Sequence, residues 1–169
     1  MKLQFSGFNK AKIEASCKAW LEDANDGLGF PPEIERHFKW VETHTEPSDV
    51  DSMAFGVFGE NKNVALGICE ITIQRKSVRS KWVKMLRLHL KPSVDEELQS
   101  GNSDLAMQVF TQCMIGTMDL QLAHKANTLK IYGRTPQQLA FLKVLASHID
   151  KHSTTKASIE GRFLSINFN

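Results

Sequence analysis

The order in which strand and helix patterns follow one another from Met53 onward constrains the fold of this chain more than any other feature. Apolar and polar residues alternate over 53–58, 64–73 and 82–90, which predicts three β-strands, because successive side chains of a strand point to opposite faces. Two segments rich in turn-forming residues, 59–63 and 77–80, separate these strands. We therefore expect an antiparallel meander.

The pattern changes to helical spacing over 103–125, where apolar residues recur every three or four positions. A short strand is predicted at 129–132. Thr135 and Gln138 then mark the start of another helix, with Thr135 as N-cap and Gln138 placed to complete a capping box. Alternation over 161–168 predicts a last strand.

The first fifty residues predict an edge strand near residues 3–5 and two amphipathic helices. The first helix is expected to end near Gly27, and the second to begin at Pro31. Helical spacing predicts these apolar faces: Ile13, Cys17, Leu21 and Ala24 on the first helix, and Ile34, Phe38 and Val41 on the second. We interpret the polar residues 43–52 as a loop, because neither side is large enough to form a domain alone, and expect a single domain over 1–169.

Composition excludes several classes of protein. The chain has 21 Lys and Arg residues and 19 Asp and Glu residues, a formal net charge of +2 that is too small to indicate a class of partner. Cys17, Cys69 and Cys113 fall on apolar faces without a C-x-x-C spacing, which favours buried, reduced thiols. His148 and His152 have helical spacing but no third ligand nearby, so no metal site is expected. No apolar run is long enough for a membrane span or a secretion signal, and we expect a cytoplasmic protein.

The succession of strand, two helices, three-stranded meander, helix, strand, helix and strand is similar to the GNAT N-acetyltransferase superfamily over nearly the whole chain. Three local stretches resemble it as well: Phe55-Gly-Val-Phe58 followed by Val64-Ala-Leu-Gly-Ile-Cys69, Leu88-His-Leu-Lys-Pro92, and Gln138-Leu-Ala-Phe-Leu-Lys-Val-Leu145. The resemblance implies an α/β fold with a mixed, mostly antiparallel central sheet of about six to seven strands, flanked by about four helices.

The resemblance also implies acetyl-CoA as co-substrate, held where the fourth and fifth strands separate. Leu88 and Leu90 would then contact the donor, and Gly101, Asn102 and Ser103 would form a shortened phosphate-binding loop at a helix start. The residues alone allow a second interpretation with equal weight, in which Asn102 or Ser103 is an ordinary helix N-cap.

Three side chains are candidates for proton transfer. Glu70 and His89 lie on neighbouring strands and are candidate general bases. Tyr132, the only tyrosine, is a candidate acid for the leaving thiolate. A structural role is the alternative for each: a cross-strand pair of Glu70 with Arg87 or His89, and a capping or exposed position for Tyr132.

The segment 71–94 carries seven cations and no acidic residue, with Trp82 among them. Such a basic hairpin can contact nucleic-acid phosphates, an acidic protein surface or the phosphates of a coenzyme, or can be a solvated turn.

Three functions follow, in this order: an acyl-CoA-dependent N-acyltransferase acting on an amine of a small molecule or protein, with the two N-terminal helices beside the acceptor; a GNAT-like binding or regulatory module without catalysis; and a nucleic-acid-associated protein that uses the hairpin at 75–91. Phe163, Ile166 and Phe168 could serve a homodimer or the core.

Overall fold

The computed structural model describes residues 2–45, 52–74, 81–152 and 155–168, and only the backbone of 151 and 152. The predicted turn at 77–80, the cations Arg75, Lys76 and Arg79, and most of the connector at 43–52 therefore lie outside the described residues.

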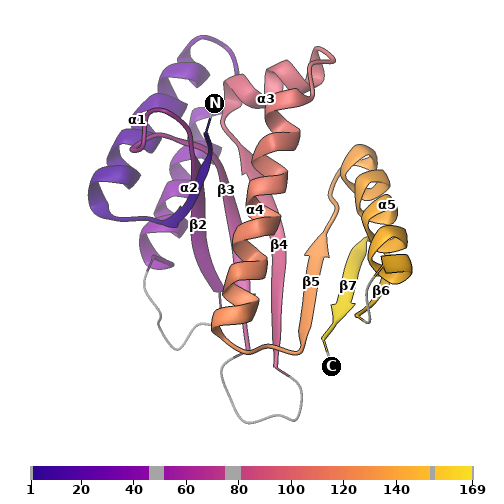
Figure 1. Cartoon of the computed structure of the whole chain (residues 1–169). Coiled ribbons are helices and arrows are strands. Elements are labelled where there is room, and N and C mark those ends of the chain that lie inside the picture. The colour runs from indigo at the N-terminus through magenta and orange to yellow at the C-terminus, as the bar shows by residue number, and fades with distance from the viewer. Residues whose placement is uncertain (1, 46–51, 75–80, 153–154, 169) are drawn as a thin grey trace. The chain divides into compact units, whose positions relative to one another are not determined.

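The described part of the chain forms seven strands and five helices (Figure 1). In order these are β1 (Gln4–Gly7), α1 (Lys10–Asn25), α2 (Pro31–Thr43), β2 (Ser52–Phe58), β3 (Ala65–Ile73), β4 (Trp82–Leu90), α3 (Pro92–Gln99), α4 (Asp104–Ala123), β5 (Thr128–Tyr132), α5 (Pro136–His152), β6 (Lys156–Glu160) and β7 (Phe163–Asn167). The strands form one sheet in the order β1-β2-β3-β4-β5-β7-β6. β4 and β5 run parallel, whereas the pairs β1–β2, β5–β7 and β6–β7 are antiparallel. The predicted mixed, mostly antiparallel sheet is confirmed.

The chain divides into two compact units, each with its own buried residues. The N-terminal unit comprises Met1–Glu70 and Leu88–Cys113, and the C-terminal unit comprises Ile71–Arg87 and Met114–Asn169. In the N-terminal unit, one apolar cluster joins α1 and α2 to the strands, including Trp20, Phe38 and Ile68. In the C-terminal unit, alternate residues of the strands are buried: Val83, Met85, Leu129, Ile131, Leu164 and Ile166.

Two elements were not predicted. The predicted strand at 161–168 is in fact the turn and second strand of a hairpin, because β6 precedes it and Gly161, with φ of 64°, forms the turn. β6 has only two apolar residues and therefore gives a weak pattern. α3 begins with Pro92 and comprises eight residues for which the sequence predicted neither a helix nor a strand.

β4 carries one residue more than the stretch of β3 that it faces. The Gln74 N–H donates to the Trp82 carbonyl at 3.0 Å, and the Lys91 N–H donates to the Leu66 carbonyl at 2.9 Å. These two hydrogen bonds enclose an interval of eight residues on β3 and nine on β4, which is the signature of a β-bulge. The buried residues of β4 accordingly change from odd to even numbers between Met85 and Leu88, so the strict alternation predicted for 82–90 is wrong.

The start of α5 confirms the predicted capping box. The Gln138 N–H donates to Thr135 Oγ1 at 3.1 Å, and the Thr135 N–H donates to Gln138 Oε1 at 3.3 Å. The Gln138 side chain also accepts the Arg134 N–H at 2.9 Å. These contacts satisfy backbone donors that no helical carbonyl can reach.

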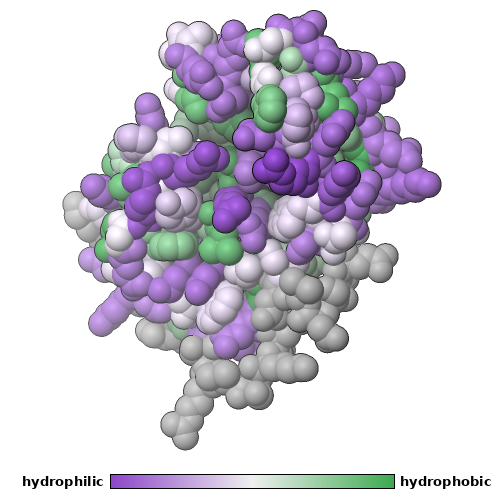
Figure 2. Space-filling model, turned by 180° about the vertical axis from the view of Figure 1, so that it is seen from behind, coloured by the Kyte–Doolittle hydropathy of each residue, from purple (hydrophilic) through white to green (hydrophobic). Residues whose placement is uncertain are grey.

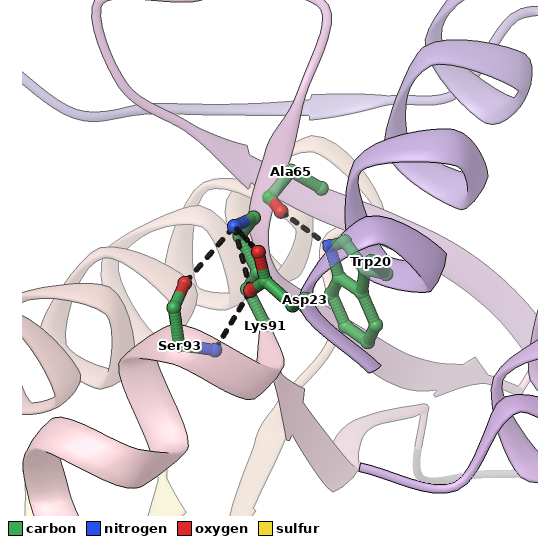
Figure 3. Close-up of polar contacts among 5 residues, drawn as sticks. All are labelled: Trp20, Asp23, Ala65, Lys91 and Ser93. Atoms are coloured by element: carbon green, nitrogen blue, oxygen red, sulfur yellow. Dashed lines mark hydrogen bonds and ion pairs between the residues drawn. The ribbon is translucent and has the colours of Figure 1, made fainter. Parts of the chain in front are cut away.

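Polar side chains on one face of α1 attach this helix to β3. The Ser16 hydroxyl donates to the Asn63 carbonyl at 3.2 Å and accepts the Ala65 N–H at 2.9 Å. One turn later, the Trp20 indole donates to the Ala65 carbonyl at 2.8 Å (Figure 3). Ser16 and Trp20 are both buried, so these bonds satisfy polar groups that water does not reach.

Asp23, on the same helix, forms an ion pair with the residue that follows β4 (Figure 3). Lys91 Nζ lies 2.7 Å from both carboxylate oxygens of Asp23 and 2.9 Å from Ser93 Oγ. The Ser93 N–H also donates to the carboxylate, at 2.8 Å. Burial alone would raise the pKa of Asp23, but the hydrogen bonds from Lys91 and Ser93 and the charge of Lys91 lower that pKa below its usual 3.8.

Replacing Asp23 by Asn removes the charge opposite Lys91, whose side chain is only 15% exposed. We expect the free energy of unfolding at neutral pH to fall by about 1.5–3 kcal/mol, the usual contribution of hydrogen bonds to charged groups. Because the folded-state pKa of Asp23 is lowered, its contribution is present above about pH 4 and is lost as the pH falls further. Urea denaturation at neutral and acidic pH measures both effects.

Glu22→Gln is the matched control, because Glu22 is exposed and its nearest contact with Lys18 is 3.9 Å long. It should cost at most a few tenths of a kcal/mol. Equal losses in the two variants would contradict an anchoring role for Asp23.

No helix among the described residues is long and apolar enough to cross a membrane. On the side of the molecule shown in Figure 2, most of the coloured surface is hydrophilic, with hydrophobic residues in small separate areas.

Candidate functional site

All but one of the predicted site residues lie in the N-terminal unit. Glu70 is on β3, Leu88, His89 and Leu90 are on β4, and residues 101–103 connect α3 to α4. Tyr132 ends β5 in the C-terminal unit.

His89 packs against a second histidine that sequence reasoning missed. The ring centroids of His37, on α2, and His89 are 4.2 Å apart, with an angle of 41° between the planes. Within α2, His37 lies next to Phe38, which belongs to the predicted apolar face. A search for apolar periodicity omits it because it is polar, although its position on that face was visible in the sequence.

Aromatic rings hold His37 on both sides. Its ring stacks on Trp20 of α1, with centroids 6.1 Å apart, and on Trp40, with centroids 5.8 Å apart. Trp40 in turn stacks on His44 at 4.6 Å. His37, Trp40 and His44 follow the three- and four-residue spacing of one helix face, so α2 presents them as a continuous stack.

The environment of His37 keeps its imidazole neutral. Burial, and secondly the neighbouring His89, lower the pKa of His37 from its usual 6.5 to about 3. Its Nε2 atom is buried and has no hydrogen-bond partner among the described residues. A neutral imidazole fixed in this way can orient the His89 ring without competing with it for a proton.

Glu70 and His89 point to the same side of the β3–β4 pair. Ile68 packs in the core cluster that contains Phe38 of α2, and Glu70 lies two residues further along β3, on the same face. His89 reaches the same helix through His37. The Glu70 carboxylate accepts a hydrogen bond of 2.9 Å from the Ser52 hydroxyl, which orients it.

Residues 101–103, which were predicted to hold the cofactor phosphates, follow the last turn of α3. The Gly101 N–H donates to the Leu98 carbonyl at 3.2 Å, and the Asn102 N–H donates to the Glu97 carbonyl at 2.9 Å. With Gly101 at φ of 98°, this is a Schellman motif, and it explains why glycine is needed there. The amides of Gly101 and Asn102 are therefore already used.

Ser103 has the position of an N-cap. Its carbonyl accepts the Met107 N–H at 2.9 Å, the first bond of α4, and Asn102 Oδ1 lies 3.4 Å from the Asp104 N–H. These contacts correspond to the cap interpretation of Asn102 and Ser103. Binding of phosphate at 101–103 remains a prediction.

The pairing of β4 with β5 is short. Residue pairs run from Trp82 opposite Thr128 to Met85 opposite Ile131, whereas β4 continues to Leu90. Leu88 and Leu90 thus lie beyond the last of these pairs. β5 itself ends at Tyr132, so four of its five residues pair with β4.

An open groove of about 500 Å³ lies between α1 and α2. Its lining consists of Ile13, Glu14, Cys17, Lys18, Leu21, Glu22, Asn25, Phe38 and Glu42. Burial raises the pKa of the Cys17 thiol, and the negative charges of Glu35 and Glu42 raise it further. The groove therefore combines an apolar floor with a negative electrostatic potential.

Tyr132 is held by neighbours on its own sheet. Its ring lies 5.1 Å from that of Phe163 on β7, and the Arg162 guanidinium lies over it at 5.9 Å. These contacts fix the ring. The proposed role of Tyr132 as an acid remains a prediction.

No protein-family model matches this sequence, and no curated protein matches it. Solved structures match it at the level of the fold. An acetyltransferase of the GNAT family from Brucella melitensis in complex with acetyl-CoA aligns over 99% of this chain and 89% of its own, with a TM-score of 0.50 and 10% identity. A probable acetyltransferase aligns over 88% of both chains, with a TM-score of 0.51 and 10% identity. A transcriptional regulator from Bacillus halodurans aligns over 95% and 97%, with a TM-score of 0.51 and 11% identity. The chain has a GNAT-like fold.

Replacing His37 by Phe tests the buried neutral imidazole. Because the folded-state pKa of His37 is lowered to about 3, the unfolded chain binds a proton that the folded chain does not. Stability should therefore fall as the pH drops below 6.5, by up to about 1.4 kcal/mol per pH unit from this group. His37→Phe should remove this part of the slope, measured by urea denaturation between neutral pH and pH 4.

His124→Gln is the control, because His124 is exposed, directly after α4, and belongs to the other unit. It should leave the slope of the wild-type protein unchanged. Parallel pH curves for wild type and His37→Phe would contradict the neutral, buried state of His37.

Proposed function

We propose that this chain is an acyl-CoA-dependent N-acyltransferase that transfers an acetyl group to an amine. The observation that carries the proposal is that β4 extends past its last residue pair with β5, Met85 opposite Ile131, in a fold that also occurs in an acetyltransferase with bound acetyl-CoA. Acetyl-CoA would supply an activated thioester carbonyl. Leu88 and Leu90, beyond the last residue pair, are the proposed contacts to the donor.

His89 is the proposed general base. An amine is protonated at neutral pH and must lose a proton before it can attack a carbonyl, and an imidazole accepts a proton in this range. His37 orients the ring of His89 from α2, and Glu70 provides a carboxylate on the same face of the sheet. Tyr132 is the proposed acid for the leaving thiolate.

The groove between α1 and α2 favours a cationic acceptor. Glu14, Glu22 and Glu42 line it together with a single cation, Lys18. Opposite charges attract an ammonium group before it is deprotonated, and the apolar floor can bind the carbon chain next to it. The acceptor we propose is therefore a primary amine on a partly apolar molecule or side chain.

The segment 101–103 fits a pyrophosphate poorly. The amides of Gly101 and Asn102 donate to carbonyls of α3, and four carboxylates lie within the segment 95–104. Those amides could turn to phosphate oxygens only if the last turn of α3 opened. This observation favours a second candidate function, a GNAT-like module that binds a partner without catalysis.

Acetyl-CoA binding separates the two candidates. If the chain is an acyltransferase, acetyl-CoA at about 100 times its Kd should stabilise the fold by about 2.7 kcal/mol, visible as a rise in Tm. Free thiol released from acetyl-CoA in the presence of a panel of primary amines then measures turnover. His89→Gln should keep the rise in Tm but lose about 10²- to 10⁴-fold in rate.

Absence of a Tm shift at millimolar acetyl-CoA would overturn the transferase proposal and leave the binding module. A shift with unchanged turnover in His89→Gln would instead retain the transferase and exclude His89 as its base.

A further inference from the structure

The small net charge of the chain hides a strong separation of charge between the two units. The C-terminal unit contains 13 Lys and Arg residues but only three acidic ones, Asp119, Asp150 and Glu160, a net charge of +10. The N-terminal unit contains the other eight cations and 16 acidic residues, a net charge of −8, and the two add to the +2 of the whole chain. A unit with such an excess of cations attracts polyanions at close range even though the whole chain is nearly neutral.

Four strands of the C-terminal unit form a sheet with one buried face. Val83 and Met85 of β4, Leu129 and Ile131 of β5, and Leu164 and Ile166 of β7 are all buried on it. α5 packs against β6 and β7. The residues that alternate with these buried ones along each strand point to the opposite face of the sheet.

The register places the residues of the opposite face in rows across β4, β5, β7 and β6. One row is Trp82, Thr128, Asn167 and Lys156. The next is Lys84, Lys130, Ser165 and Ser158. A third contains Tyr132, Phe163 and Glu160. We call this surface the basic sheet face; apart from buried Ser165, its residues are half-exposed or exposed.

Aromatic rings and cations touch one another on the basic sheet face and at its edge. Lys84 Nζ lies 4.0 Å from the centroid of the Trp82 ring. Tyr132 and Phe163 have centroids 5.1 Å apart, and the Arg162 guanidinium lies over Tyr132. Half-exposed aromatic rings on a sheet can stack with planar bases, and the cations beside them can bind phosphates.

The single acidic side chain on this face is neutralised within the protein. Lys130 Nζ lies 2.6 Å from the Glu160 carboxylate, a hydrogen bond that lowers the pKa of Glu160. Lys84 and Lys156 have no such carboxylate partner within hydrogen-bond distance among the described residues. Arg162 donates from Nε and Nη2 to the Gly133 and Arg134 carbonyls, which leaves its other N–H groups for other acceptors. Lys84 stands directly opposite Lys130 in the register of β4 and β5.

We propose that the basic sheet face binds single-stranded nucleic acid, with bases stacked on Trp82, Tyr132 and Phe163 and phosphates bound by Lys84, Lys156 and Arg162. A duplex keeps its bases stacked inside, so it offers these rings no base faces. An acidic protein surface would match the cations but would leave the three rings without a function. This site shares Tyr132 with the proposed transferase, but it does not depend on acyl transfer.

Fluorescence anisotropy with a labelled oligouridine of about 12 nucleotides tests the proposal, a length within the site size of such platforms. We expect a Kd of about 1–100 μM near physiological salt, weakening between about 50 and 200 mM KCl. Lys84→Gln should reduce the slope of log K against log[KCl] by about 0.7, the value for one phosphate of a single strand. Trp82→Leu and Tyr132→Leu should each weaken binding about fivefold or more.

Matched controls change the same residue types outside this face. Lys143→Gln removes an exposed cation of α5 in the same unit, and Phe30→Leu removes an exposed aromatic ring of the N-terminal unit. Both should leave affinity within twofold of wild type. If Lys143→Gln weakens binding as much as Lys84→Gln, or if the two aromatic variants bind normally, the attraction is general and the proposal is wrong.

The type of nucleic acid is decided by parallel titrations. Oligouridine and oligothymidine of equal length share the stacking and phosphate chemistry, so their ratio tells RNA from single-stranded DNA, and binding of either supports the proposal. A duplex that binds as tightly as a single strand would overturn it.

Two measurements separate loss of binding from loss of folding. Melting curves of each variant report folding, and Trp82→Phe, a milder ring substitution, should retain most of the affinity.

Discussion

The structure depends first on the polar face of α1. Ser16, Trp20 and Asp23 follow one another at helical spacing, and each side chain satisfies a group of the sheet or of the segment after it. An apolar face alone would allow the helix to slide or rotate, whereas these hydrogen bonds fix its position residue by residue. α2 packs against α1 in the same core, so the placement of His37 beside His89 depends on the same contacts.

The two units differ in the sign of their charge and in the polar groups that they present. The N-terminal unit is acidic and contains the histidine pair, the groove between α1 and α2, and the carboxylate of Glu70. The C-terminal unit is basic and shows aromatic rings on a sheet face. The negative charge of the N-terminal unit attracts cations such as an amine, and the positive charge of the C-terminal unit attracts polyanions. Because these two opposite charges nearly cancel, the net charge of the whole chain does not reveal them.

Sequence patterns predicted the parts of the fold that rest on periodicity or on local capping. The apolar face of α2, the bounds of β4 and the capping box at Thr135 and Gln138 are confirmed. The bulge in β4 was missed because an extra residue leaves no local signal; it follows only from hydrogen bonds between strands. β6 was missed because it contains few apolar residues. For the candidate site, strand pairing suggested Glu70 and His89, whereas His37 was omitted because it is polar, although its position on the apolar face of α2 was visible in the sequence.

The groove between α1 and α2 can be labelled at a cysteine that the chain already contains. Cys17 lines that groove and is partly exposed, whereas Cys69 and Cys113 are fully enclosed. A thiol-specific fluorophore would therefore attach to one position, at the wall where the acceptor is proposed to bind, without any engineered cysteine. The labelled wild-type chain can in this way report directly on which small molecules enter the groove.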